Sequence, residues 1–371
     1  MTVLFIGSGH RNFSDFLQPK SRGRIAAYGQ IFDRVLIIAF TAPGFSSQSL
    51  ASNVTVYPTN SRIRYAALWH ALVLGRRLLR DIPLSEEVVI SAQDPFESGL
   101  VAWVLTWGRK ARLQFQVHTD FTIPAFRHHS FENRLRWYMA RFLLGRADCI
   151  RAVSRRIADS LEKVFRISAR RVVILPIWTP APPRNAPSVI LAPELSVLVV
   201  SRLEKEKAMD DAIRAFQLFI NRGGVGKLTI VGEGRERPGL EKLARETRPQ
   251  GSVEFVGWQD ETAPFYASAN VYLMTSHYEG WGISAAEAVG AGIPVVMTDV
   301  GLAGEMVKND ANGIMVAVGD TEAIAEALLR LYHNPELRER YSRFPAPVAS
   351  SHTEYLEQYR QAMTLCRTAL S

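Results

Sequence analysis

Short apolar runs alternate with helical patterns along most of the chain. Between the runs lie stretches with helical spacing of their apolar residues, among them residues 63–79, 131–146 and 209–220. Strands that alternate with helices indicate crossover units and parallel sheets. The pattern therefore predicts an α/β protein. The runs expected to form strands are residues 3–6, 34–39, 88–91, 115–117, 147–154, 172–175, 196–200, 228–231, 253–256, 269–274 and 294–297. Ser154, at the end of the run 147–154, is expected to be the N-cap of the next helix.

A proline cluster interrupts this alternation between residues 176 and 195. Such a composition is typical of a linker, and 371 residues suffice for two domains. We predict one Rossmann-like domain at residues 1–180 and a second at residues 181–351. The cluster comprises Pro176, Pro180, Pro182, Pro183, Pro187 and Pro193.

The most informative stretch is HYEGWGISAAEAVGAGIPVVMTD, residues 277–299. Its loop, residues 279–282, leads into a helix expected at residues 283–289, which Gly290 and Gly292 should end. The first N–H groups of a helix lack partners and lie at the positive end of its dipole. Glycines let a bulky anion approach that backbone closely. The loop therefore predicts a phosphate site.

Two carboxylates bracket this phosphate site. Glu279 stands in the loop, and Glu287 lies about one turn inside the helix. Carboxylates accept hydrogen bonds from hydroxyl groups, so a ribose and a sugar are suitable partners. For either glutamate taken alone, an ordinary solvated side chain is the alternative.

The stretch EGWGISAAEAVGAGIPVV resembles the signature of the family 4 (group 1) retaining glycosyltransferases, which have the two-domain GT-B fold. The resemblance implies that Glu279 contacts the donor sugar and Glu287 the nucleotide ribose. It also implies that the backbone between them meets the donor diphosphate. The donor-binding residues expected there are Gly280, Trp281, Gly282 and Ile283.

Further donor-site positions follow the same resemblance. SRLEKEK places Arg202 and Lys207 where the family holds the diphosphate, and a guanidinium and an ammonium group suit that ligand. Trp258, after the run 253–256, stands where the family receives the nucleotide base. Gly9, in the glycine loop after the first strand, is expected near the donor phosphates.

The resemblance implies two Rossmann-like domains that face a central cleft. The C-terminal helix, within residues 352–371, should cross back to the N-terminal domain. The expected reaction moves a hexose from a nucleotide-diphosphate sugar to a glycan or lipid-linked acceptor with retention of configuration. Lys207 and Arg202 would stabilise charge on the departing diphosphate. No Asp-x-Asp pair or clustered His and Cys ligands suggest a metal site, so we expect neither a metal nor another cofactor.

Polar residues also follow two strands of the N-terminal half. Asp94 comes after the run 88–91, and His118 and Asp120 come after the run 115–117. The carboxyl ends of parallel strands border the crevice where such sheets bind ligands. We expect these residues to contact the acceptor, with His118 as a catalytic acid or base or as an orienting donor. A hydrogen-bonded structural histidine is the alternative.

Charge is distributed unevenly along the chain. The net charge is +8, and residues 1–180 hold about 25 Lys and Arg against about 12 Asp and Glu. Three segments of this half mix aromatic residues with arginines: 63–80, 100–112 and 131–146. We predict a peripheral contact between this half and an anionic membrane. An idle basic surface is the alternative.

Other functions explain fewer of these features. A nucleotide-sugar epimerase of similar fold would need additional acid and base groups. A nucleic-acid-binding protein would explain the basic half but not Glu279 and Glu287, and no nucleic-acid motif is recognised. An NAD-linked enzyme is disfavoured because Gly7-Ser8-Gly9 stops short of the dinucleotide fingerprint.

Compartment is indicated by weaker signals. The first residues lack the basic start and long apolar core of a signal peptide, and no apolar run is long enough to span a bilayer. Cys149 and Cys366 fit neither a metal spacing nor a disulfide framework, which favours a reducing compartment. We therefore expect a cytoplasmic protein, located at the inner face of the cell membrane if the basic half binds lipid.

Overall fold

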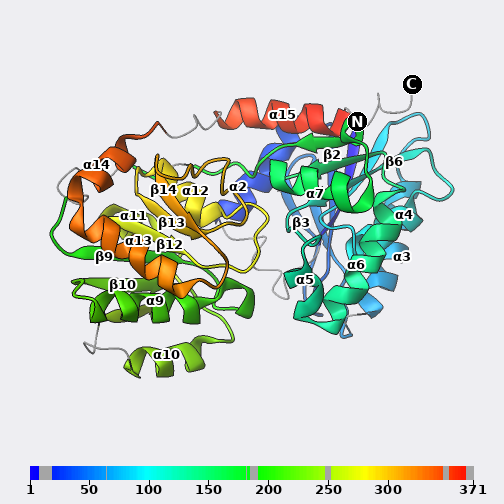
Figure 1. Ribbon diagram of the computed structural model, residues 1–371. Coiled ribbons are helices and arrows are strands. Elements are labelled where there is room, and N and C mark those ends of the chain that lie inside the picture. Colours follow the sequence, from blue (N-terminus) through cyan, green and yellow to red (C-terminus); the bar gives the residue numbers. More distant parts are fainter. Residues whose placement is uncertain are drawn as a thin grey trace. The chain divides into compact units, whose positions relative to one another are not determined.

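The computed structural model describes residues 1–7, 19–63, 65–180, 182–183, 191–246, 252–345 and 351–364. The chain forms two compact units, shown in Figure 1. Unit 1 comprises Met1–Pro176 and Ser350–Ser371, and unit 2 comprises Ile177–Ala349. The sequence analysis placed the two boundaries a few residues later, after residues 180 and 351.

Unit 1 contains an eight-stranded sheet in the order β3-β4-β2-β1-β5-β6-β7-β8, parallel except for β3 against β4. The connections from β4 to β8 all advance along the sheet in one direction, so right-handed crossovers place α3, α4, α6 and α7 on one face. Its strands are β1 (Thr2–Gly7), β2 (Arg34–Ala39), β3 (Gln48–Ala51), β4 (Val54–Pro58), β5 (Val88–Ala92), β6 (Ala111–Val117), β7 (Cys149–Ala152) and β8 (Val172–Ile174). Its α-helices are α2 (Pro19–Ala27), α3 (Ala66–Arg80), α4 (Glu97–Leu105), α5 (Pro124–His129), α6 (Phe131–Leu144), α7 (Arg155–Phe165) and α15 (His352–Thr364).

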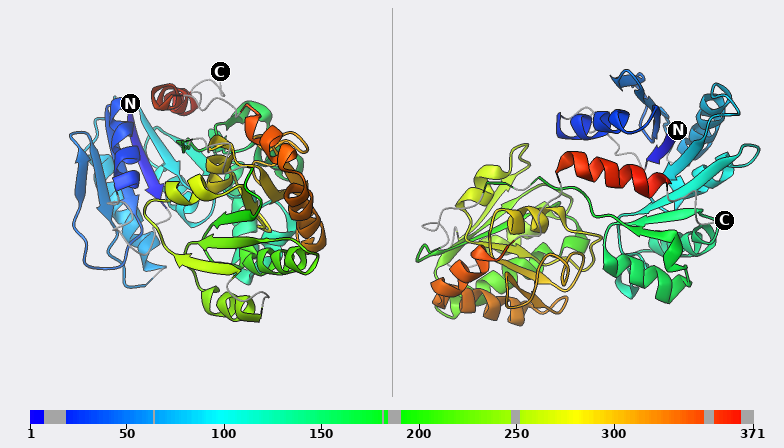
Figure 2. Two further views of the ribbon diagram at one scale, coloured as in Figure 1. Left: turned by 90° about the vertical axis from the view of Figure 1, so that its left-hand side faces the viewer. Right: turned by 90° about the horizontal axis from the view of Figure 1, so that it is seen from above.

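The last described helix, α15, packs on unit 1, as predicted. Gln116 in β6 donates a hydrogen bond to the Tyr359 hydroxyl at 2.8 Å, and the buried Arg151 in β7 donates one to the Tyr355 hydroxyl at 3.0 Å. Tyr359 also stacks on Tyr28, with ring centroids 4.9 Å apart. Both views of Figure 2 show α15, in red, near the N-terminal strand of the same unit.

Unit 2 contains a six-stranded parallel sheet in the order β11-β10-β9-β12-β13-β14. Its strands are β9 (Leu195–Val200), β10 (Gly226–Val231), β11 (Val253–Gly257), β12 (Val271–Met274), β13 (Val295–Thr298) and β14 (Gly313–Val316). Its helices are the 3-10 turn η3 (Lys205–Lys207), α9 (Met209–Asn221), α10 (Arg237–Glu246), α11 (Ala263–Ser268), α12 (Ile283–Gly290), α13 (Thr321–His333) and α14 (Pro335–Arg343).

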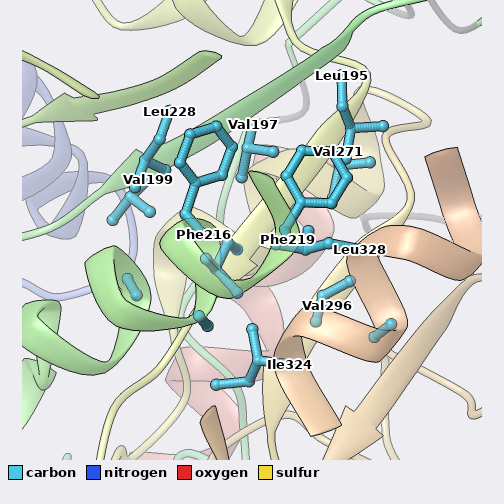
Figure 3. Packing of buried hydrophobic residues seen from close by; sticks show 14 of the residues in the cluster. Leu195, Val197, Val199, Phe216, Phe219, Leu228, Val271, Val296, Ile324 and Leu328 are labelled. Carbon is cyan, nitrogen blue, oxygen red and sulfur yellow. The ribbon is translucent and has the colours of Figure 1, made fainter. Parts of the chain in front are cut away.

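The core of unit 2 lies between the sheet and the pair α9 and α13. Phe216 and Phe219 of α9 and Leu328 of α13 are fully buried against valines of the strands (Figure 3). The apolar side of α9 follows the helical spacing seen in the sequence, so burial of that side orients the helix on the sheet.

The predicted fold class is confirmed, with several local corrections. The aromatic and basic segment 100–112 comprises the end of α4, at Leu105, and the start of β6, at Ala111. The sequence analysis did not identify the short strands β3, β4 and β14. Cys149 is disulfide-bonded, and Cys366 lies outside the described residues. The expectation that it fits no disulfide is therefore wrong, and the argument for a reducing compartment loses that support.

Candidate functional site

The candidate site of unit 2 lies at the carboxyl ends of β9 and β12. In the sheet, β10 and β11 lie on one side of β9, whereas β12, β13 and β14 lie on its other side. Such a switch point leaves a crevice at the strand ends, where open parallel sheets bind ligands. Arg202 and Lys207 follow β9, and the loop 279–282 follows β12. The fold therefore brings the two predicted motifs to the same edge.

Three glycines let the surrounding loops approach one another at backbone distance. A Cβ atom on Gly232 would lie 1.9 Å from the carbonyl oxygen of Ser201, and one on Gly234 would lie 2.1 Å from that of Leu203. On the other side, a Cβ atom on Gly301, at φ 57°, would lie 2.5 Å from the Trp281 carbonyl oxygen. Larger side chains would push these loops apart, so the glycines fix the backbone that carries the site.

Lys207 and Glu279 form an ion pair at the centre of this site. The Lys207 ammonium group lies 2.5 Å from Glu279 Oε1, and the two side chains are only 13% and 15% exposed. Ser276 donates a hydrogen bond to the same carboxylate oxygen at 2.9 Å. Thr275, after β12, donates one to the Lys207 carbonyl oxygen at 3.0 Å, which fixes the lysine backbone. A nearly buried cation is thus held beside the glycine loop.

The N-terminus of α12 presents free backbone donors at the end of this loop. Gly282 precedes the helix with φ 95° and ψ 67°, a left-handed conformation that favours glycine. Within the described residues, the N–H groups of Ile283, Ser284 and Ala285 have no hydrogen-bond acceptor. Ala286 is the first to donate within the turn, to the Gly282 carbonyl at 3.0 Å. Free donors and the helix dipole together suit an anion.

Glu287 lies in a polar cluster with two buried tyrosines. The Tyr266 hydroxyl donates to Glu287 Oε2 at 2.7 Å and also lies 3.0 Å from the Ser284 carbonyl oxygen. Tyr272 donates to the Ser284 hydroxyl at 2.7 Å. Burial, the largest cause, raises the pKa of both phenols, so they stay neutral donors. The sequence analysis missed Tyr266 and Tyr272 because both stand in apolar runs, where tyrosine looks like a core residue.

The remaining donor-site residues differ in exposure. Arg202 is exposed, and its guanidinium lies 3.1 Å from Glu206 Oε1. Trp258 is 66% exposed, so its ring is open to a stacking partner. Trp281 is 6% exposed, and its indole nitrogen has no hydrogen-bond partner within the described residues. Gly9 lies outside the described residues.

In unit 1, His118 lies at the end of β6, beside the end of β5. Its Nε2 atom lies 3.1 Å from Gln93 Oε1, which can only accept, so His118 donates this hydrogen bond. Burial, together with the positive charges of Arg151 and Arg24, lowers the pKa of His118 to about 3. The imidazole is therefore neutral at pH 7 and too weakly basic for general-base catalysis there. The geometry favours the orienting alternative for this residue.

Asp94 and Asp120 are both engaged within their own loops. Asp94 Oδ1 accepts from the Phe96 N–H at 2.9 Å, and burial raises the pKa of this carboxyl to about 6. Asp120 is 3% exposed, and its Oδ1 accepts from the N–H and hydroxyl of Thr122 at 3.1 and 2.6 Å. A carboxylate that is already bonded within its own loop suits a structural role better than acceptor contact. The acceptor role of both residues stays a prediction.

Metal and membrane signals are few. In the part of the chain that the structure describes, no three His, Cys, Asp or Glu side chains gather as metal ligands would. No described helix is both long and apolar enough to cross a membrane. The independence from metal expected from the sequence stays a prediction.

Comparison with known proteins identifies the family. The model of the family described as "Glycosyl transferases group 1" matches residues 187–344. The "Glycosyl transferase 4-like domain" matches residues 32–178. The chain belongs to the group 1 glycosyltransferases. The resemblance drawn from the glycine loop is confirmed, and the donor-site geometry of unit 2 lies within the first of these matches.

Curated relatives of this group 1 glycosyltransferase match over limited stretches. The lipopolysaccharide core biosynthesis glycosyltransferase LpsE of Rhizobium meliloti is 38% identical over 30% of this chain and 33% of its own length. The glycogen synthase of Mycobacterium tuberculosis is 34% identical over 43% of this chain and 38% of its own. The poly(glycerol-phosphate) alpha-glucosyltransferase of Bacillus subtilis is 28% identical over 48% of this chain and 27% of its own length. The matched stretches thus span about a third of these relatives.

Solved structures share the fold of the whole chain. A sucrose-phosphate synthase from Thermosynechococcus elongatus superposes with a TM-score of 0.75 at 18% identity, covering 99% of this chain and 97% of that one. HepE from Anabaena, solved in complex with UDP-glucose, gives a TM-score of 0.72 at 17% identity, covering 99% and 100%. These likenesses show the GT-B fold of the group 1 glycosyltransferases.

Proposed function

We propose that this glycosyltransferase transfers a hexose from a nucleotide-diphosphate sugar bound to unit 2, with retention of configuration and without a metal ion. The observation that carries the proposal is the Lys207–Glu279 pair beside the free N–H groups at the start of α12. A cation and aligned backbone donors are what a leaving diphosphate requires. They supply this stabilisation without metal coordination.

Each part of the donor has a partner of suitable chemistry in this proposal. The diphosphate binds Lys207 and the α12 N-terminus, with Arg202 at the exposed side. The ribose hydroxyls donate to Glu287, which Tyr266 already holds in place. The base stacks on Trp258, whose exposed ring has room for it. This arrangement assigns a distinct role to each donor-site residue.

Glu279 faces the sugar in this arrangement. Its carboxylate accepts from sugar hydroxyls, while the ion pair with Lys207 holds it at the reaction centre. Departure of the diphosphate breaks the bond from the anomeric carbon to the phosphate oxygen. The acceptor hydroxyl attacks the same face and passes its proton to the leaving phosphate oxygen. Retention follows because the bond forms on the face from which the diphosphate leaves.

The acceptor is proposed to be a glycan or a lipid-linked molecule that meets unit 1. The names of LpsE, of glycogen synthase and of the Bacillus subtilis glucosyltransferase all refer to glycan or polyol-phosphate products. The neutral His118 would orient an acceptor hydroxyl as a hydrogen-bonding partner. Neither an epimerase nor a nucleic-acid-binding function gains support from these relatives.

Donor binding can be tested by thermal shift with UDP, GDP, ADP and their sugar esters, in magnesium and in EDTA. Binding to the folded state alone must raise the melting temperature. One base should give a shift that EDTA leaves unchanged and that Lys207→Met removes. Lys205→Gln is the matched control, because Lys205 is an exposed lysine of the same 3-10 turn. A shift seen only with magnesium would contradict independence from metal.

Retention can be tested without knowing the acceptor. Slow hydrolysis of an α-linked nucleotide sugar releases free sugar, whose first-formed anomer is visible by proton NMR. A retaining enzyme releases the α anomer before mutarotation mixes the two. Initial release of the β anomer would contradict the proposed stereochemistry but not the donor site.

A further inference from the structure

The outward side of α6 carries four large apolar side chains in one row. Phe131, Leu135, Tyr138 and Phe142 are 79%, 54%, 57% and 47% exposed. Their spacing of four, three and four residues places them on one side of the helix. The other side of α6 is already buried in unit 1. The helix therefore has a second apolar side that stays about half exposed or more.

This row continues onto the end of α4. The Trp103 ring packs edge to face against Phe142, at a centroid distance of 5.3 Å. It packs in the same way against Trp107, at 4.8 Å. Trp107 is 60% exposed. The Arg146 guanidinium lies over the rings of both Trp103 and Phe142. Aromatic rings and a cation thus form one continuous surface across two helices.

The third helix of this layer has the same character. Tyr65, just before α3, is 71% exposed, and Trp69 and Val73 are 62% and 50% exposed at successive spacings of four residues. Arg76 and Arg80 prolong the same side toward the end of the helix. An apolar start and a basic end therefore share one side of α3.

Helices α3 and α4 lie directly against each other. A Cβ atom on Gly75 of α3 would lie 2.5 Å from Leu105 of α4, so the glycine permits close packing. The Arg109 guanidinium, after α4, donates to the carbonyl oxygens of Leu79 and Ile82 at 2.9 Å. All three helices lie on one face of the sheet, and Figure 1 shows them together. We call the outward side of α3, α4 and α6 the aromatic–basic face.

Positive charges outnumber negative ones among the described residues of this face. Its two helix glutamates, Glu97 and Glu132, both pair with Arg136, at 2.9 and 3.0 Å. Arg134 and Arg141 flank the apolar row of α6, and within the described residues neither has a salt-bridge partner. Helix α3 contains three arginines and no acidic residue. The partner of this face should therefore be anionic.

We propose that the aromatic–basic face docks on the surface of an anionic lipid bilayer. Tyrosine and tryptophan rings, with an apolar body and a polar edge, favour the headgroup zone, and arginines meet the lipid phosphates. A nucleic acid would match the charge but not the exposed row of phenylalanine, leucine and valine. The inference stands apart from the proposed donor site, and it supplies a reason for a lipid-linked acceptor.

Flotation with vesicles tests the inference on the full chain. The probes are phosphatidylcholine vesicles with and without about 30% phosphatidylglycerol. Wild type should bind only the anionic vesicles, and salt should weaken the binding. Arg134→Gln/Arg141→Gln should lower the partition coefficient roughly 10- to 30-fold, since each arginine near the surface contributes to the attraction. Leu135→Ser/Tyr138→Ser should lower it roughly tenfold or more.

Matched controls come from unit 2. Val225→Ser/Val318→Ser removes two apolar side chains of similar exposure, 48% and 44%, and Lys242→Gln/Arg340→Gln removes two exposed charges. Both controls should bind vesicles like wild type. Every variant is also tested for the nucleotide thermal shift, which reports folding and the donor site separately from lipid binding.

Two results would overturn the inference. One is a wild type that does not bind anionic vesicles, or face variants that bind as well as the controls do. The other is a wild-type dimer in sedimentation velocity that Leu135→Ser/Tyr138→Ser converts to a monomer. The face would then be an interface between two copies of the chain. If no nucleotide raises the melting temperature of the wild type, that result would instead count against the proposed function alone.

Discussion

Separating the Lys207–Glu279 pair should reveal whether it is held ready for a diphosphate. Lys207→Met removes the charge but keeps most of the side-chain volume. Among the residues that the structure describes, this leaves the Glu279 carboxylate, 15% exposed, with only the Ser276 hydroxyl as a partner. Breaking a fully buried ion pair costs roughly 3–5 kcal/mol, and breaking an exposed one roughly 0–1 kcal/mol. At this degree of burial we expect a cost of about 2–3 kcal/mol.

The double variant separates the pair from its parts. Glu279→Gln should cost less than Lys207→Met, because the amide oxygen can still accept from the ammonium group. Lys207→Met/Glu279→Gln leaves no unpaired charge, so it should be more stable than Lys207→Met alone, with a coupling of about 2 kcal/mol. In a domain of this size, Lys207→Met should lower the melting temperature by about 5–10 °C.

Nucleotide titration gives the more discriminating result. Glu279 neutralises the lysine that the diphosphate needs, and it is itself an anion beside that site. Glu279→Gln should therefore bind a nucleoside diphosphate more tightly, by about 1–2 kcal/mol or roughly 5- to 30-fold. The same variant should transfer sugar more slowly, because the sugar hydroxyls lose a charged acceptor. Calorimetric titration with UDP, GDP and ADP measures the first effect.

The exposed pair Arg343–Glu339, with side chains 75% and 27% exposed, is the matched control. Arg343→Gln should cost less than about 1 kcal/mol and leave nucleotide binding unchanged. The reasoning is refuted if Lys207→Met costs no more than this control. It is also refuted if Glu279→Gln binds nucleoside diphosphates more weakly than wild type.

Four further predictions concern single side chains. Tyr266→Phe removes the hydroxyl that holds Glu287, so the free energy of unfolding should fall by about 1–3 kcal/mol. In calorimetric titration, this variant should lose more affinity for a nucleoside diphosphate than for pyrophosphate, which has no ribose. His118 has a pKa lowered to about 3, so wild type should lose about 2–3 kcal/mol of stability as the pH falls from 7 to 4.5, and denaturant curves of His118→Gln should lack this loss. Burial raises the pKa of Asp94 to about 6, so the folded protein loses stability as the pH rises from about 4 to 6 and this carboxyl ionises. Asp94→Asn should therefore be more stable than wild type at pH 7 by about 1–3 kcal/mol. Equal stability of the two proteins at pH 7 would contradict the burial argument. Arg166, the exposed C-cap of α7, has a left-handed backbone conformation at φ 57°, which favours glycine. Chemical denaturation should therefore show a free energy of unfolding that is about 0.5–1 kcal/mol higher in Arg166→Gly and not higher in Arg166→Ala.

Features that depend on neighbouring residues in the chain were predictable. The run of glycines before α12 and the five-residue interval from Arg202 to Lys207 each lie within one loop or turn. Their chemistry follows from local backbone conformation, which the sequence reports directly. Ser154 as the N-cap of α7 is a similar case, since its hydroxyl accepts from the Ile157 N–H at 3.2 Å.

Features that depend on contacts across the fold were not predictable. The sequence analysis treated residues 100–112 as one aromatic and basic segment, but pairing of Ala111 and Arg112 with β5 draws them into β6. Periodicity over so few residues cannot separate a helix end from the start of a strand. Tyr266 was missed for a related reason. A tyrosine in an apolar segment is assigned to the core unless the partner of its hydroxyl is known.

The amino-acid sequence by itself determined the fold class, the family and the loop that should meet a diphosphate. These are encoded by hydrophobic period, by glycine positions and by short spacings, all of which are local. Only the tertiary structure paired Lys207 with Glu279, placed Tyr266 on Glu287 and lowered the pKa of His118. Packing brings these groups together across long stretches of chain. Burial then sets their pKa values and the strength of the interactions between them. Neither quantity exists before the chain has folded.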